Sequence, residues 1–283
     1  MEIKQNPFSV YDFLGYFIPG ATLCYLVAFA QEHAKLFNAT LPNLKEIENL
    51  LPFILISYLA GHILNYISSF TIEKHSVWNY GYPSKYIVGE KHDRNIKSKT
   101  ERACRLINSI LIAPVSIPDA IFGRLLNLRR FISRAEDETL KTIIKHKIYE
   151  LLREQGAPDF KKYAPPHLTN YFSFAYHYCV ENYPYHFPKM QNYVALYGFL
   201  RANCLIFVIC FWIIALHLEL TCDFYTHNKQ ILAGLATTSA IAFILYLGFM
   251  KFYRRFCLEV LMALASNYKP NKINTDTEEQ TSE

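Results

Sequence analysis

The sequence predicts an all-α membrane protein with four transmembrane helices in a two-plus-two layout, and with a helical cytoplasmic insertion between the two pairs. Of its 283 residues 52% are hydrophobic, and the mean hydropathy of +0.06 is above what soluble domains of this size usually show. The apolar residues gather in four runs close to bilayer length, since about 20 helical residues cross a hydrocarbon core of about 30 Å. The charged residues are concentrated between these runs.

The first two runs are Val10–Ala30 and Leu50–Phe70. The first contains a single acid, Asp12, near its start, and Pro19, which removes a backbone donor and is expected to kink the helix. The second contains no acidic or Lys/Arg residue. Residues 1–70 are therefore expected to form transmembrane helices 1 and 2 with a short N-terminal segment.

Residues 71–198 contain no run of membrane length and hold most of the charge, so we expect them to form a cytoplasmic helical domain. Apolar residues recur at helical spacing across Ala120–Glu154. His75 and His92 stand in a polar, basic stretch that we interpret as a solvated loop.

The other two runs, Phe199–Leu220 and Ile231–Met250, place transmembrane helices 3 and 4 within residues 199–250. Arg201, at the start of the third run, is expected to snorkel to the membrane boundary. Residues 251–283 are predicted to continue as a cytoplasmic helical extension, followed by a polar, disordered tail.

The placement of basic residues predicts the orientation. The loop 31–49 has two Lys or Arg residues and the loop 221–230 has one, whereas residues 71–198 have 19 against 12 acids. Because Lys and Arg accumulate on the cytoplasmic side, both termini and the central region are expected in the cytoplasm of a bacterium. The protein would then be a multi-pass protein of the inner (cytoplasmic) membrane.

A polar stripe in the second run is the main sign of function. Ser57, Gly61 and Asn65 fall at helical spacing, with His62 beside them. These residues either form a wet, pore-lining face, or allow close helix packing in which Asn65 bonds across helices. Asp12 either favours cations at a pore mouth or caps the start of its helix. The candidate pore-lining residues are Asp12, Ser57, Gly61, His62 and Asn65.

The central region carries arginines that are suited to an anionic ligand, because guanidinium groups bind phosphate in a bidentate manner. The alternative is that they are the positive-inside bias itself, meeting anionic lipid headgroups. The candidate ligand-binding residues are Arg102, Arg105, Arg124, Arg129, Arg130 and Arg134.

Motifs for chemistry are not visible. The sequence contains no phosphate-binding G-x-x-x-x-G-K-[ST], no H-E-x-x-H and no G-x-S-x-G. Its seven cysteines are irregularly spaced, which argues against a disulfide framework and a zinc site, and predicts reduced thiols. We therefore expect no catalytic residues, no metal and no cofactor.

Three segments carry a resemblance: FSVYDFLGYFIPG at 8–20, YLAGHILNYISS at 58–69 and YVALYGFLRANC at 193–204. With the two-plus-two layout, they resemble small multi-pass proteins encoded in bacterial anti-phage defence islands, including the membrane effector of the Hailong system. The resemblance implies an ion channel that is controlled by a nucleotide or oligonucleotide signal from a partner nucleotidyltransferase. Opening would depolarise the membrane and abort infection.

Four helices are too few to enclose an aqueous path, so a channel would require a symmetric homo-oligomer, for which we expect a homotetramer. Two alternatives remain open. One is a non-conducting scaffold that anchors a partner protein in the lipid bilayer. The other is a membrane enzyme acting on a lipid phosphate, which a carboxylate or histidine cluster at the cytoplasmic boundary would favour.

Overall fold

The structure, a computed structural model, describes residues 12–34, 47–90, 98–125, 134–156, 171–220 and 228–269. Every regular element in these ranges is a helix, which confirms the all-α class. The predicted disordered tail after Pro270 lies outside the described residues.

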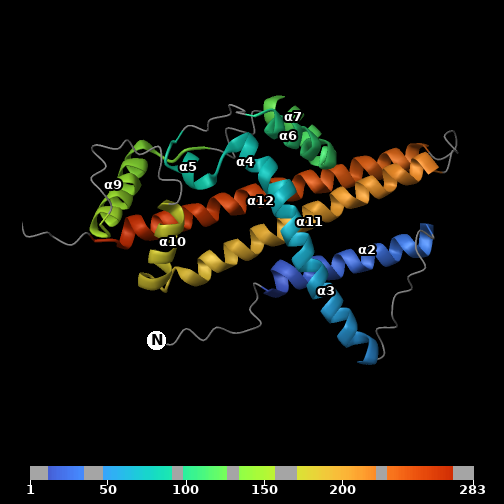
Figure 1. Cartoon of the computed structure of the whole chain (residues 1–283), viewed down its shortest axis with the longest axis horizontal. Coiled ribbons are helices and arrows are strands. Elements are labelled where there is room, and N and C mark those ends of the chain that lie inside the picture. The colour runs from blue at the N-terminus through green and yellow to red at the C-terminus, as the bar shows by residue number, and fades with distance from the viewer. Residues whose placement is uncertain are drawn as a thin grey trace, which may run out of the picture.

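A long antiparallel pair of helices forms the axis of the molecule (Figure 1). α11 spans Phe187–Leu220 and α12 spans Asn228–Asn267, with 34 and 40 residues. At 1.5 Å per residue these helices are about 51 and 60 Å long, well beyond the roughly 30 Å of a hydrocarbon core. Each helix therefore extends from the apolar half of the molecule into the half formed by the central region.

The first two runs form helices that approach each other closely. A π-helix, η1 (Phe13–Phe17), leads into α2 (Ile18–Ala34), and both pack against α3 (Ile47–Ser68). A Cβ atom added to Gly20 would lie 1.7 Å from the carbonyl oxygen of Ser57, and one added to Gly61 would lie 1.9 Å from that of Tyr16. Only glycine fits at these two positions, as in close helix packing within membranes.

Replacing Gly20 or Gly61 by alanine is expected to destabilise the protein by about 1–3 kcal/mol, because the obstructing atoms are backbone atoms that cannot rotate away. Unfolding in SDS, followed by circular dichroism, measures the loss. Gly234→Ala is the matched control, because its nearest neighbour is a side-chain atom of Ile214 at an ordinary 3.8 Å. Equal stability of all three variants would show that α2 and α3 do not approach as described.

α3 does not end with its apolar run. It continues through a π-helix, η2 (Ser69–Glu73), into α4 (Lys74–Tyr80) and then α5 (Pro83–Ile87). Figure 1 shows α3 and α4 crossing the α11–α12 pair. The helix therefore carries residues that the sequence placed in a polar loop, among them His75, into the packed interior.

Two helices that meet at a bend follow, and then two more helices. α7 (Ala113–Leu125) lies against α12, and α6 (Lys99–Leu111) packs against α7 and α4. α9 (Glu138–Glu154) and α10 (Tyr171–Asn182) lie at the C-terminal end of α12 (Figure 1). Among the described residues, the helical spacing across Ala120–Glu154 falls on α7 and on α9, and residues 134–137 ahead of α9 are not helical. α9 starts afresh because the carboxylate of Asp137 accepts a hydrogen bond from the amide of Thr139 at 3.2 Å.

Three helices in the described ranges are long and apolar enough to cross a membrane: Leu50–Ile87, Phe187–Leu216 and Ile231–Asn267. A fourth span is present if α6 and α7, which meet at a bend of 100°, count as one. Phe13–Phe29 is apolar but shorter. The chain thus has the helices of a membrane protein, with three to four candidate spans.

Candidate functional site

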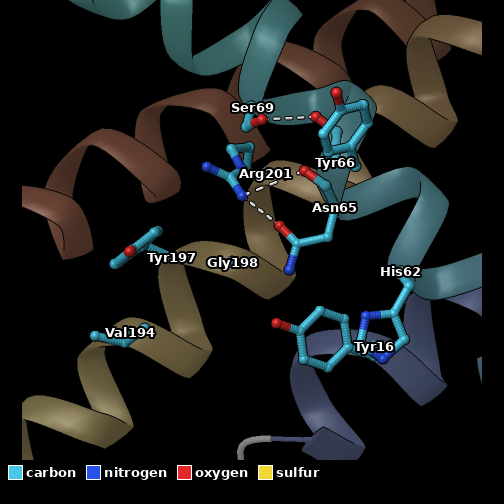
Figure 2. Close-up of a pocket in the computed structure, with 9 residues that line it drawn as sticks. All are labelled: Tyr16, His62, Asn65, Tyr66, Ser69, Val194, Tyr197, Gly198 and Arg201. Carbon is cyan, nitrogen blue, oxygen red and sulfur yellow. Dashed lines mark hydrogen bonds between the residues drawn. The ribbon is translucent and has the colours of Figure 1, made fainter.

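A cleft of about 320 Å³ opens where η1, α3 and α11 meet. The cleft lies beside the first turn of the third apolar run, where this run joins the central region. Figure 2 shows its walls, which are mostly aromatic and polar. The lining residues are Tyr16, His62, Asn65, Tyr66, Ser69, Val194, Tyr197, Gly198 and Arg201.

Arg201 is the charged residue of the cleft and is only 8% exposed. Its guanidinium donates one hydrogen bond to the carboxylate of Glu73 and another to the side-chain oxygen of Asn65. The sequence predicted that Arg201 would snorkel to the membrane boundary. In the structure its side chain is instead buried and paired within the protein. Arg201 joins α11 to α3 through Asn65 and to the end of η2 through Glu73. The Glu73 carboxylate compensates the charge of the buried guanidinium.

The bond from Arg201 also fixes how Asn65 is turned. Because the amide oxygen accepts from Arg201, the amide nitrogen faces the opposite way, 3.9 Å from the position that a Cβ atom on Gly198 would take. In Figure 2 this nitrogen and the hydroxyl of Tyr16 both point into the cleft. The cleft thus presents hydrogen-bond donors between aromatic walls.

The predicted pore-lining residues divide into two groups. His62 and Asn65 line the cleft, and the exposed His62 ring stacks on Tyr16 with 4.0 Å between ring centroids. Ser57 and Gly61 are buried between α3 and the helices before it, where the Ser57 hydroxyl lies 3.8 Å from the Cys24 sulfur. These are the contacts that close packing requires.

Asp12 stands elsewhere, at the start of η1. Its side chain makes no capping hydrogen bond to the first turn of that helix. The capping role that the sequence offered for Asp12 is therefore not seen, and the structure does not bring this residue into the cleft.

The predicted ligand-binding arginines lie on separate segments. Arg102 is exposed on α6, and Arg105 donates to Glu101 at 2.6 Å while lying 5.5 Å from the centre of the Trp78 ring. Arg124 stands near the end of α7, and Arg134 is exposed ahead of α9. Arg129 and Arg130 lie outside the described residues.

A second polar cluster, which was not predicted from the sequence, lies buried between α4 and α7. The Asp119 carboxylate is 3.3 Å from His75 Nε2 and accepts a hydrogen bond from the Tyr80 hydroxyl, and Asn79 Nδ2 is 3.0 Å from the same His75 nitrogen. His75 is 5% exposed and Asp119 2% exposed, so the interpretation of His75 as part of a solvated loop was wrong. Asp119 is the only charged residue in an apolar stretch from Leu106 to Gly123, and this isolation was the signal that could have found it.

Six cysteines in the described ranges are free thiols, as the irregular spacing predicted. Cys222 lies outside those ranges. Burial raises the pKa of Cys179, in α10, to about 12, so this thiol stays protonated and unreactive at neutral pH.

Comparison of the chain with protein-family models, with curated proteins and with solved structures finds no match.

Proposed function

We propose that this chain is an anti-phage membrane effector that forms an oligomeric ion channel in the bacterial inner membrane. A nucleotide-type signal acting on the cytoplasmic helices would gate the channel, and opening would depolarise the cell. One observation carries the proposal: polar residues of a membrane helix, His62 and Asn65, share a cleft with the buried Arg201, whose guanidinium is paired with Glu73. Ionisable groups at membrane helices are costly, and they commonly mark pathways for ions or substrates.

The proposed layout has four spans, formed by α2, α3, α11 and α12, with both termini in the cytoplasm. η1 and α2 together supply 5 and 17 residues of continuous helix, about 33 Å at 1.5 Å per residue. This length is enough to cross a hydrocarbon core of about 30 Å, although its most apolar part is shorter. The count of basic residues on each side supports the orientation.

An exposed apolar face on α3 supports assembly. Its large side chains face away from the rest of the chain, and this face runs up to His62 and the cleft. In an isolated subunit the polar residues would be exposed to lipid, whereas in a ring they would face a shared path. We assign a homotetramer to this ring. The exposed side chains are Leu51, Leu55, Ile56, Leu59, Ile63 and Tyr66.

The connection to the cytoplasmic helices supports gating. α12 is continuous from the apolar half into the core that it forms with α9 and α10, where Val260 and Leu261 are fully buried. Glu73, the partner of Arg201, lies one residue before α4. A ligand that favours one arrangement of these helices would therefore shift the equilibrium between closed and open states. An oligonucleotide made by a partner nucleotidyltransferase would suit the excess of basic residues in the central region.

The buried cluster bears on the enzyme alternative, because Asp119 and His75 are the kind of residues that such an enzyme would need at this boundary. Their exposed fractions of 2% and 5% leave no access for a lipid phosphate in this conformation. We therefore assign them to the packing of α7. The scaffold alternative is decided by ion flux, since a scaffold conducts nothing.

Asn65→Leu tests the proposal in liposomes loaded with a fluorescent ion indicator. The substitution removes a hydrogen bond to a charged group, worth about 1.5–3 kcal/mol, and is expected to change flux roughly tenfold or more. Asn203→Leu is the matched control, because Asn203 lies in α11 but its amide binds the Phe199 carbonyl of its own helix at 2.9 Å. Flux that is equal in both variants would remove the cleft from the ion path.

A further inference from the structure

The outer face of α6 and α7 is apolar and exposed. On α6, Leu106, Ile107 and Ile110 are 63%, 59% and 56% exposed, and Ile117 and Phe122 continue the surface onto α7. Burying one such side chain is worth about 1.5–3 kcal/mol, so a continuous patch of this kind is unfavourable in water. Contiguous exposed apolar surface marks contact with a partner or with a membrane.

The bend between these helices lies at the depth of the membrane-spanning runs. Trp212 Nε1 donates to the Leu111 carbonyl at 2.7 Å, and the Ser239 hydroxyl donates to the Pro114 carbonyl at 2.8 Å. Trp212 and Ser239 stand near the middle of the third and fourth apolar runs. Broken backbone at membrane depth needs partners within the protein, and these two side chains supply them.

Two polar side chains, Asn108 of α6 and Asp119 of α7, are directed toward the protein. The Asn108 amide donates to the Thr71 carbonyl at 3.1 Å, and Asp119 bonds to His75 and Tyr80. In the half of each helix that lies nearest the bend, the exposed side chains are all apolar. The basic residues of α6, Lys99, Arg102 and Arg105, stand in its first half, away from the bend, where they would meet anionic headgroups.

Neither helix is long enough to cross alone. Each has 13 residues, about 20 Å at 1.5 Å per residue, and the 100° bend prevents them from acting as one straight span. We propose that α6 and α7 form a re-entrant element that enters the bilayer from the cytoplasmic side, turns at Ile112 and returns, with its outer face in contact with lipid. Part of the 71–198 region would thus be membrane-embedded rather than cytoplasmic, whether or not the protein conducts ions.

Cysteine accessibility tests this inference. Single cysteines are placed at Thr100, Ile110 and Arg134, all exposed in the chain, in a Cys104→Ala background. Spheroplasts and inverted membrane vesicles are treated with a membrane-impermeant maleimide, and peptide mapping identifies the labelled site. We expect Thr100→Cys and Arg134→Cys to react in inverted vesicles alone. Ile110→Cys should react in neither preparation, and only after solubilisation in SDS.

Two results would overturn the inference. Rapid labelling of Ile110→Cys in inverted vesicles would place the apolar face in water. Labelling of Thr100→Cys and Arg134→Cys from opposite sides would make the pair a broken span. As a second measurement, a fluorophore on Ile110→Cys should be quenched by lipids brominated on their acyl chains, and an identically labelled Thr100→Cys should not. Equal quenching at both positions would also contradict the inference.

Discussion

Replacing Glu73 by alanine is expected to destabilise the protein by about 3–5 kcal/mol, because it removes the carboxylate that compensates the buried guanidinium of Arg201. Unfolding in SDS measures the change. Glu101→Ala is the matched control, since the Glu101 side chain is 34% exposed and its pair with Arg105 lies one helical turn apart on α6. We expect that variant to lose less than about 1 kcal/mol.

The double variant Glu73→Ala/Arg201→Leu separates the pair from its surroundings. It removes both charges, so it is expected to be more stable than Glu73→Ala alone. If Glu73→Ala costs no more than Glu101→Ala, the pair does not hold α11 against the α3–η2 junction. In that case its proposed part in gating fails as well.

Replacing Asp119 by alanine is the second large effect that we expect. The change leaves the Tyr80 hydroxyl and the His75 ring buried without their shared acceptor, at about 1–3 kcal/mol for each group. It also cuts a link between α7 and α4, so Ile110→Cys should become easier to label in the same background.

Asp137→Ala provides the comparison for Asp119→Ala. Asp137 is an exposed N-cap of α9, and its loss is expected to cost about 1 kcal/mol without changing the labelling of Ile110→Cys. Asp119→Asn keeps one acceptor and should fall between the two. Equal effects of Asp119→Ala and Asp137→Ala would show that the buried cluster does not position α7.

The helical class was predictable from the sequence because it depends on local properties. Apolar runs near bilayer length predicted α3, α11 and α12, and the irregular cysteine spacing predicted free thiols. The packing of α6 and α7 was not predictable in this way. It depends on contacts such as Trp212 with Leu111, which are 101 residues apart and leave no periodic trace in the sequence.

The polar stripe shows the same limit at the site. Spacing alone could not separate packing from pore lining, because both need small or polar residues on one face. The structure separates them by partner: Gly61 meets the backbone of Tyr16, whereas Asn65 meets Arg201, 136 residues away. His75 was misjudged because its polar neighbours suggested a loop, although the helix continues through η2 and buries it.

Single-channel recording from the purified protein in a planar bilayer, with the subunit number measured in parallel by native mass spectrometry, tests the central claim most directly. We expect discrete current steps from a symmetric oligomer, and an altered conductance or open probability in Asn65→Leu but not in Asn203→Leu. A bilayer that stays silent with every anionic nucleotide tested, together with a monomer in detergent, would contradict the channel and favour the scaffold.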